Sequence, residues 1–125
     1  MYLLDSNIYI NFYDRYYRNE FFPTFWLNFV SILNSDVKVP DIVVSENYQD
    51  PWFRDWLDDK YEKDLIDHKS YAREWSEVIQ YIQDSLLYKD TALSSEKGWA
   101  NEKIADPWLI AIAKRENYTI VTDEV

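Results

Sequence analysis

Residues 2–7 of the chain read YLLDSN, a short apolar run that ends in an acid and continues into two polar residues. The pattern predicts a buried β-strand over residues 2–4 that ends at Asp5. Near the other end of the chain, residues 119–123 read TIVTD, a β-branched run that also ends in an acid. In an open α/β sheet, ligands bind beyond the carboxyl ends of the strands. Asp5 and Asp123 are therefore expected to lie at one crevice.

A third acid, Asp106, stands directly before Pro107 and an apolar segment that reaches residue 113. An acid followed by proline predicts that Asp106 caps a helix, which would end near Asn117. This helix start would bring a third carboxylate to the crevice. Gathered carboxylates repel one another unless a cation such as Mg²⁺ or Mn²⁺ binds between them, and phosphodiester hydrolysis is the simplest chemistry of such a site.

The segments between these acids show mostly helical periodicity. Apolar residues recur with helical spacing over residues 21–33 and 70–88, and Pro51 starts a helix predicted to reach residue 63. A helix break is expected at residues 34–36.

A second short strand is predicted over residues 37–39, ended by Pro40. Asp41 is expected to cap the following helix, which carries Glu46. Strands that alternate with helices in this way predict an α/β fold with a mostly parallel sheet.

Length and composition narrow the class of protein further. A chain of 125 residues with 47% apolar residues forms one domain, and one Gly with four Pro favours helices over hairpins. No window is long and apolar enough for a membrane span, and the first residues lack the pattern of a signal peptide. The chain has no Cys, which fits a reducing cytoplasm.

The formal net charge of −10 argues against a broad electrostatic contact with nucleic acid. Nucleic acid would have to be held locally, with Arg15, Arg18 and Lys38 as candidate phosphate contacts, and an acidic chain also suits a basic protein partner. The six Trp are predicted to be mainly core residues, with one or two available for stacking on bases. The lone His68 is not assigned a catalytic role.

These residues together resemble a PIN-domain nuclease, the family that contains many bacterial toxin ribonucleases. Four pieces carry the resemblance, in the family's order and at similar spacing, and together they make up about a quarter of the chain: residues 2–7, 39–46, 105–113 and 120–123. The resemblance implies a PIN-like three-layer α/β/α domain over residues 1–125, with a short, mostly parallel sheet flanked by helices and a helical insertion around residues 52–100.

The resemblance also implies a function. The family's catalytic and metal-binding acids correspond to Asp5, Glu46, Asp106 and Asp123, which would hold Mg²⁺ or Mn²⁺ and hydrolyse RNA internally. Such toxins are usually neutralised by a cognate antitoxin and often form homodimers. The residues that flank the acids could bond substrate or metal-held water, or could equally make local turn bonds: Ser6, Asn7 and Thr122.

Three of the four acids also have a structural interpretation. Asp5 could be a turn acid, Asp106 a helix cap and Asp123 a solvated terminal acid. The chain reaches only Val125, whereas PIN-domain nucleases usually continue with a further strand and helix, so a shortened copy is expected. An alternative function is therefore a catalytically inactive, PIN-like interaction module. A phosphohydrolase of small phosphates ranks last, because a single Gly leaves no phosphate-cradling loop.

Overall fold

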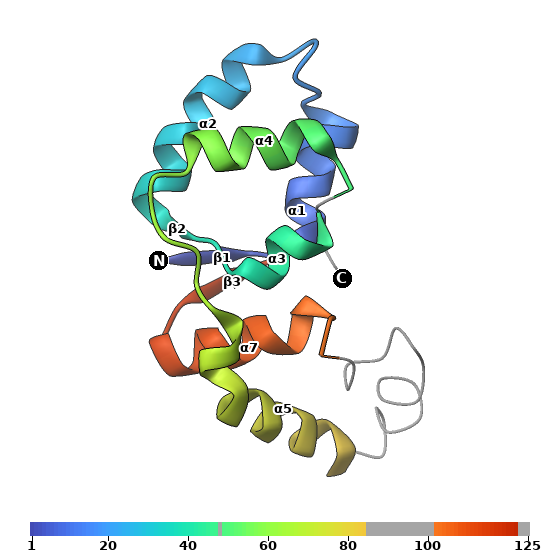
Figure 1. Cartoon of the computed structure of the whole chain (residues 1–125), viewed down its shortest axis with the longest axis vertical. Coiled ribbons are helices and arrows are strands. Elements are labelled where there is room, and N and C mark those ends of the chain that lie inside the picture. Colours follow the sequence, from blue (N-terminus) through green and yellow to red (C-terminus); the bar gives the residue numbers. More distant parts are fainter. Residues whose placement is uncertain (48, 85–101, 123–125) are drawn as a thin grey trace.

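The structure of the chain is a computed structural model that describes residues 1–47, 49–84 and 102–122. Figure 1 shows a mixed α/β arrangement, mostly helical, around a small parallel sheet. The α/β class and the parallel sheet predicted from the sequence are confirmed at this level. None of the helices in this part of the chain is long and apolar enough to cross a bilayer.

The sheet consists of three short strands, namely β1 (Tyr2–Leu4), β2 (Val37–Lys38) and β3 (Thr119–Val121). Their order is β2-β1-β3, and both outer strands run parallel to β1. Strand β1 has the predicted bounds, β2 ends one residue before its predicted end, and β3 lies within the β-branched run of residues 119–123. Because they run in the same direction, their carboxyl ends meet at one edge of the sheet.

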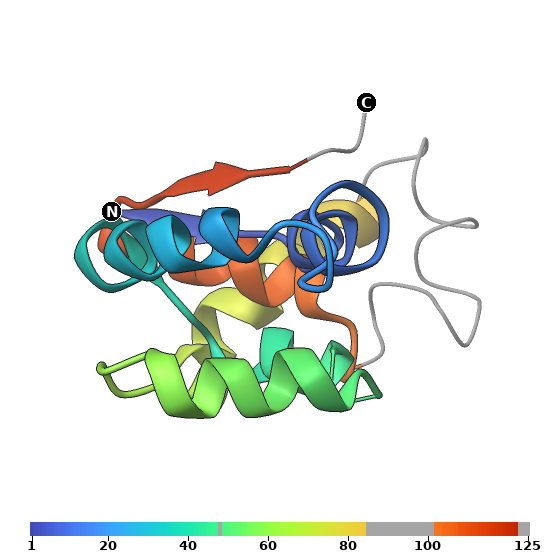
Figure 2. The ribbon, with the colours of Figure 1, turned by 90° about the horizontal axis from the view of Figure 1, so that it is seen from above.

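The described helices, in chain order, are α1 (Ser6–Ile10), η1 (Asn11–Tyr16), α2 (Pro23–Asp36), α3 (Asp41–Glu46), α4 (Pro51–Lys60), η2 (His68–Tyr71), α5 (Ala72–Asp84) and α7 (Ala105–Glu116). Figure 1 places α2 and α7 on opposite sides of the sheet, with α5 packed outside α7. Seen from above in Figure 2, β3 lies far from α4, the green helix.

The predicted break at residues 34–36 is wrong, because α2 continues to Asp36 and leads directly into β2. The side chain of Asn34 explains why a residue that usually breaks helices is tolerated here. Its amide donates to the carbonyl of Lys60 at 2.9 Å, and its oxygen accepts from the backbone N–H of Glu62 at 2.8 Å. These bonds give the side-chain amide of Asn34 hydrogen-bond partners at the end of α4. The amide therefore does not compete with the backbone of α2, and the helix continues.

Two other helices differ from their predicted bounds. α4 begins at Pro51 as expected, capped by Asp50, but it ends at Lys60 instead of residue 63. The helix predicted from residue 70 begins at Ala72, after the η2 turn, and its predicted end at residue 88 lies outside the described residues. The helical insertion predicted over residues 52–100 therefore contains α4 and α5 in its described part.

The start of α7 also differs from the prediction. The N-cap position is Ile104 and the helix begins at Ala105, so Asp106 lies in the first turn and does not cap the helix. The acid is still well placed there, because the N-terminus of a helix favours negative charge. The predicted stop is confirmed: Asn117 has the left-handed conformation, with φ of 59°, that often ends helices.

An aromatic cluster fills much of the space between α2 and α4. The ring of Trp26 in α2 lies 4.8 Å from that of Trp52 and 4.9 Å from that of Trp56, both edge-on. Trp26 and Trp108 are almost fully buried, and Trp52, Trp56 and Trp75 are partly buried against the core. The prediction that the Trp residues are mainly core is confirmed for these five, and Trp99 lies outside the described residues.

Candidate functional site

Asp5 stands at the junction of β1 and α1, where the central strand ends. Its side chain is buried, with 5% of the residue exposed. Asp5 occupies the N-cap position of α1, yet its carboxylate makes no capping hydrogen bond. Instead, the hydroxyl of Thr122 donates to Oδ2 of Asp5 at 3.1 Å. The carboxylate is therefore aimed at the end of β3 and not at the helix that it precedes.

Glu46 is the last residue of α3 and links two helix starts. Ser6, the first residue of α1, donates from its hydroxyl to Oε1 of Glu46 at 2.5 Å. Ala105, the first residue of α7, donates from its backbone N–H to Oε2 at 3.4 Å. An unpaired carboxylate at this position would be costly, and these bonds show how the protein satisfies it.

The predicted site residues thus come from segments that meet at the carboxyl edge of the sheet. Asp5 and Thr122 are in contact, Ser6 joins Glu46, and Asp106 directly follows the residue whose N–H binds Glu46. Asn7 is exposed in α1. Asp123 lies outside the described residues. Of the predicted phosphate contacts, Arg18 forms an ion pair with Glu20 at 3.2 Å. Arg15 and Lys38 remain predictions.

The donors at this edge suit a hard divalent cation. Carboxylate and hydroxyl oxygens are the ligands that Mg²⁺ and Mn²⁺ prefer. No Lys or Arg of the described residues forms an ion pair with Asp5. The one hydrogen bond from Thr122 leaves the buried charge without a cationic partner in this part of the protein, so a bound cation would fit here.

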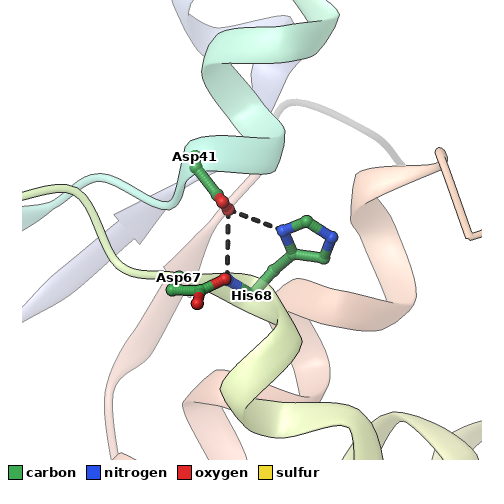
Figure 3. A group of neighbouring side chains, drawn as sticks. All are labelled: Asp41, Asp67 and His68. Atoms are coloured by element: carbon green, nitrogen blue, oxygen red, sulfur yellow. Dashed lines mark hydrogen bonds and ion pairs between the residues drawn. The ribbon is translucent and has the colours of Figure 1, made fainter.

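A second group, Asp41, Asp67 and His68, contains side chains able to hold a metal ion. Its ligand atoms all lie within 4.8 Å of one another, and among the described residues Asp5, Glu46 and Asp106 do not form a group as tight. Figure 3 shows the Asp41 carboxylate facing both the ring and the backbone of His68. Oδ1 of Asp41 lies 2.7 Å from Nδ1 of His68 and accepts from the His68 backbone N–H at 3.1 Å.

The prediction that Asp41 caps α3 is wrong. Pro40 occupies the N-cap position and Asp41 is the first helical residue, so its carboxylate is directed to His68. No local pattern in the sequence connects Asp41 with Asp67 and His68. They meet because an isolated parallel bridge pairs Pro40 with Ile66, with the N–H of Asp41 donating to the carbonyl of Ile66 at 2.9 Å.

An open hollow of about 530 Å³ lies beside Glu46. Among the described residues, it is lined by Ile42, Ser45, Glu46, His68, Glu102 and Lys103. Glu46 and His68 thus face the same space. Its volume falls within the roughly 300–1,000 Å³ that is typical of small-ligand sites.

A second, smaller hollow is also lined by Glu46 and by Tyr13, whose hydroxyl donates to Oδ1 of Asn47 at 2.8 Å. Burial, with a further contribution from the negative charges of Asp50 and Asp14, raises the pKa of Tyr13 to about 12. Tyr13 therefore remains a neutral hydrogen-bond donor at physiological pH.

Comparison with known proteins identifies a family but no function. The model of a family described as a domain of unknown function, DUF4411, matches residues 2–125, which is all of the chain except Met1. No curated protein matches the chain. No solved structure matches it either. On the strength of the family match, the chain belongs to the DUF4411 family.

Proposed function

We propose that this chain is a metal-dependent endoribonuclease of PIN-like, three-layer α/β/α architecture. The observation that carries the proposal is the state of Asp5. Its carboxylate is buried at the carboxyl edge of a parallel sheet, does not cap the adjacent helix, and has no ion pair with a basic side chain in the described part of the chain. Burying a charge without a partner is costly, and a divalent cation would offset that cost.

The surrounding residues have distinct roles in this proposal. Asp5, Glu46 and Asp106 would hold Mg²⁺ or Mn²⁺ through carboxylate oxygens, together with Asp123 from outside the described residues. When bound, the ion would supply Lewis-acid stabilisation of the charge that develops on the phosphate. Thr122 and Ser6 each hold one carboxylate oxygen in place. Such fixed orientation is what a metal site requires of the groups around its ligands.

The biological setting that we propose comes from the resemblance to PIN-domain nucleases. We propose that the chain is the toxin component of a toxin–antitoxin pair, that it acts on RNA in the cytoplasm, and that a cognate antitoxin restrains it. The net charge of −10 favours a basic antitoxin segment as partner. A homodimer would be consistent with the resemblance to PIN-domain nucleases.

RNA cleavage in defined metal conditions tests the proposal. Labelled single-stranded RNA is incubated with the wild-type protein in Mg²⁺, in Mn²⁺ and in chelator, and then with Asp5→Asn and Asp106→Asn. We expect cleavage that requires the metal and falls at least about a hundredfold in both variants, because the ligands would no longer hold the ion. Asp59→Asn, an exposed acid of α4, is the matched control. Unchanged cleavage in both site variants would overturn the proposal.

A second candidate function is a catalytically inactive interaction module, which the net charge of −10 favours. Such a module would bind a basic protein or a second copy of itself. It would show no metal-dependent cleavage under any of these conditions. The affinity of such a module for a basic partner would not change in Asp5→Asn. This result would distinguish the interaction module from the ribonuclease, whose cleavage should fall in the same variant.

A further inference from the structure

His68 is held rigidly at the wall of the hollow that also contains Glu46. Asp41 accepts hydrogen bonds from both the ring and the backbone of His68. The ring also packs edge-on against Trp108, with centroids 4.7 Å apart, and Trp108 is itself stacked on Trp75. A side chain fixed on several sides is preorganised, so little entropy is lost when a ligand binds to its remaining edge.

The remaining edge of the ring carries Nε2. In Figure 3 this edge points away from Asp41, toward the side on which α7 begins. Nε2 has no hydrogen-bond partner among the residues that the structure describes. In the neutral imidazole, a carboxylate at Nδ1 favours the tautomer with the proton there, and this tautomer leaves Nε2 as an acceptor.

The charges around the hollow disfavour a phosphate inside it. Glu46 and Glu102 both line the space, and Lys103 is the one lysine or arginine among its described lining residues. Ile42 contributes an apolar wall. Acceptors at the edge of a partly apolar pocket suit a neutral ligand that carries N–H donors, which describes a nucleobase better than a phosphate.

We propose that this hollow binds an unpaired nucleobase next to the cleaved phosphodiester, and that His68 recognises the base through Nε2 while Asp41 positions the ring. The inference rests on the proposed ribonuclease function, because Glu46 belongs both to the hollow and to the site of cleavage. Guanine is the expected base. Its Watson–Crick edge offers neighbouring imino and amino donors, which match the two acceptors His68 and Glu102.

Cleavage of a randomised pool of short single-stranded RNA, with sequencing of the products, tests this inference. The wild-type protein should enrich guanine at one position beside the cut by roughly three- to tenfold, the discrimination expected of a hydrogen bond of ordinary strength. His68→Phe keeps a ring that can pack on Trp108 but removes Nε2, so it should lose the preference and raise KM more than it lowers kcat. His68→Gln retains an acceptor and should keep part of the preference.

Asp59→Asn, at an exposed acid of α4 that is not among the described residues lining the hollow, is the matched control. It should retain the wild-type base preference. A wild-type enzyme that cleaves without base preference, or a His68→Phe variant with an unchanged preference, overturns the inference and leaves the ribonuclease function standing. Absence of metal-dependent cleavage by the wild-type protein overturns both proposals.

Discussion

The hydroxyl of Thr122 donates a hydrogen bond of 3.1 Å to Oδ2 of Asp5, although the two residues are 117 positions apart in the chain. The parallel pairing of β1 with β3 brings them together. Leu4 pairs with Val121, and the N–H of Asp5 donates to the carbonyl of Val121 at 3.0 Å. Residues near the two ends of the chain thus lie side by side, because the strands before them share a register.

Substitution of the buried Asp5 should change stability and the proposed cleavage in opposite directions. Asp5→Asn keeps the shape of the side chain and an acceptor for Thr122 but removes the charge. In chelator, we expect the free energy of unfolding to rise by about 1 kcal/mol, because an uncompensated buried carboxylate has been removed. Urea unfolding of the two proteins, with chelator and then with Mn²⁺, measures the difference.

Mn²⁺ should stabilise the wild-type protein and not Asp5→Asn, because a ligand that binds only the folded state raises its stability. The exposed Asp59→Asn should respond to Mn²⁺ as the wild type does. If the ion raises the stability of Asp5→Asn as much as that of the wild type, Asp5 does not hold the cation.

Ser6 and Glu46 offer a second prediction, because their hydrogen bond joins positions that are 40 residues apart. Ser6→Ala should lower cleavage by roughly tenfold, since a misdirected Glu46 is a poorer ligand. A double-mutant cycle with Glu46→Gln should show a coupling of about 1 kcal/mol in stability.

Ser76→Ala is the control for this cycle. Its hydroxyl makes the same kind of local bond, to the carbonyl of Ala72 within α5, and Ser76 is exposed and is not among the described residues lining the hollow beside Glu46. Additive effects of Ser6→Ala and Glu46→Gln would mean that the bond contributes nothing to the site.

The strands and the predicted acids were accessible from the sequence because their patterns are local. Apolar runs that end in an acid identified β1 and β3, and the apolar run before Asn117 identified α7. The sheet then brings Asp5 near Thr122 through strand geometry alone. The resemblance to PIN-domain nucleases supplied Glu46, whose bond to Ser6 no local pattern predicts.

Other features depend on contacts that a single segment does not encode. Asn34 was expected to end α2, but its side chain is satisfied by the backbone of Lys60 and Glu62. Asp41 was expected to cap α3, and the bridge between Pro40 and Ile66 directs it to His68 instead. In each case a hydrogen bond between distant segments decides the outcome, and only the folded structure reveals it.

Two leucines on the same helix give a direct test of the core. Leu33 is fully buried, whereas Leu27 in α2 is 72% exposed. Leu33→Ala should reduce the free energy of unfolding by about 2–5 kcal/mol, because it leaves a cavity, while Leu27→Ala should change it by less than about 0.5 kcal/mol. Urea unfolding monitored by Trp fluorescence distinguishes the two. Equal effects would mean that α2 does not pack on the sheet through Leu33.

Stability at high pH should depend on Tyr13. Its pKa is raised by burial to about 12 in the folded protein and is about 10 in the unfolded chain. The folded state therefore binds this proton more tightly, so the contribution of Tyr13 to stability is complete below about pH 10 and is lost as the pH rises toward 12. Burial also raises the pKa values of Tyr9 and Tyr61, which add to the loss.

The tyrosinate form of Tyr13 can no longer donate to Asn47, and it would face the carboxylates of Asp14 and Asp50. Tyr13→Phe should therefore be less stable than the wild type near neutral pH by about 1 kcal/mol, yet lose stability less steeply between pH 10 and 12. Urea midpoints across this range measure the slopes, with Tyr81→Phe, an exposed residue of α5, as control. Parallel slopes for the wild type and Tyr13→Phe would show that Tyr13 does not titrate with folding, and the alkaline loss would then have to come from the other buried tyrosines.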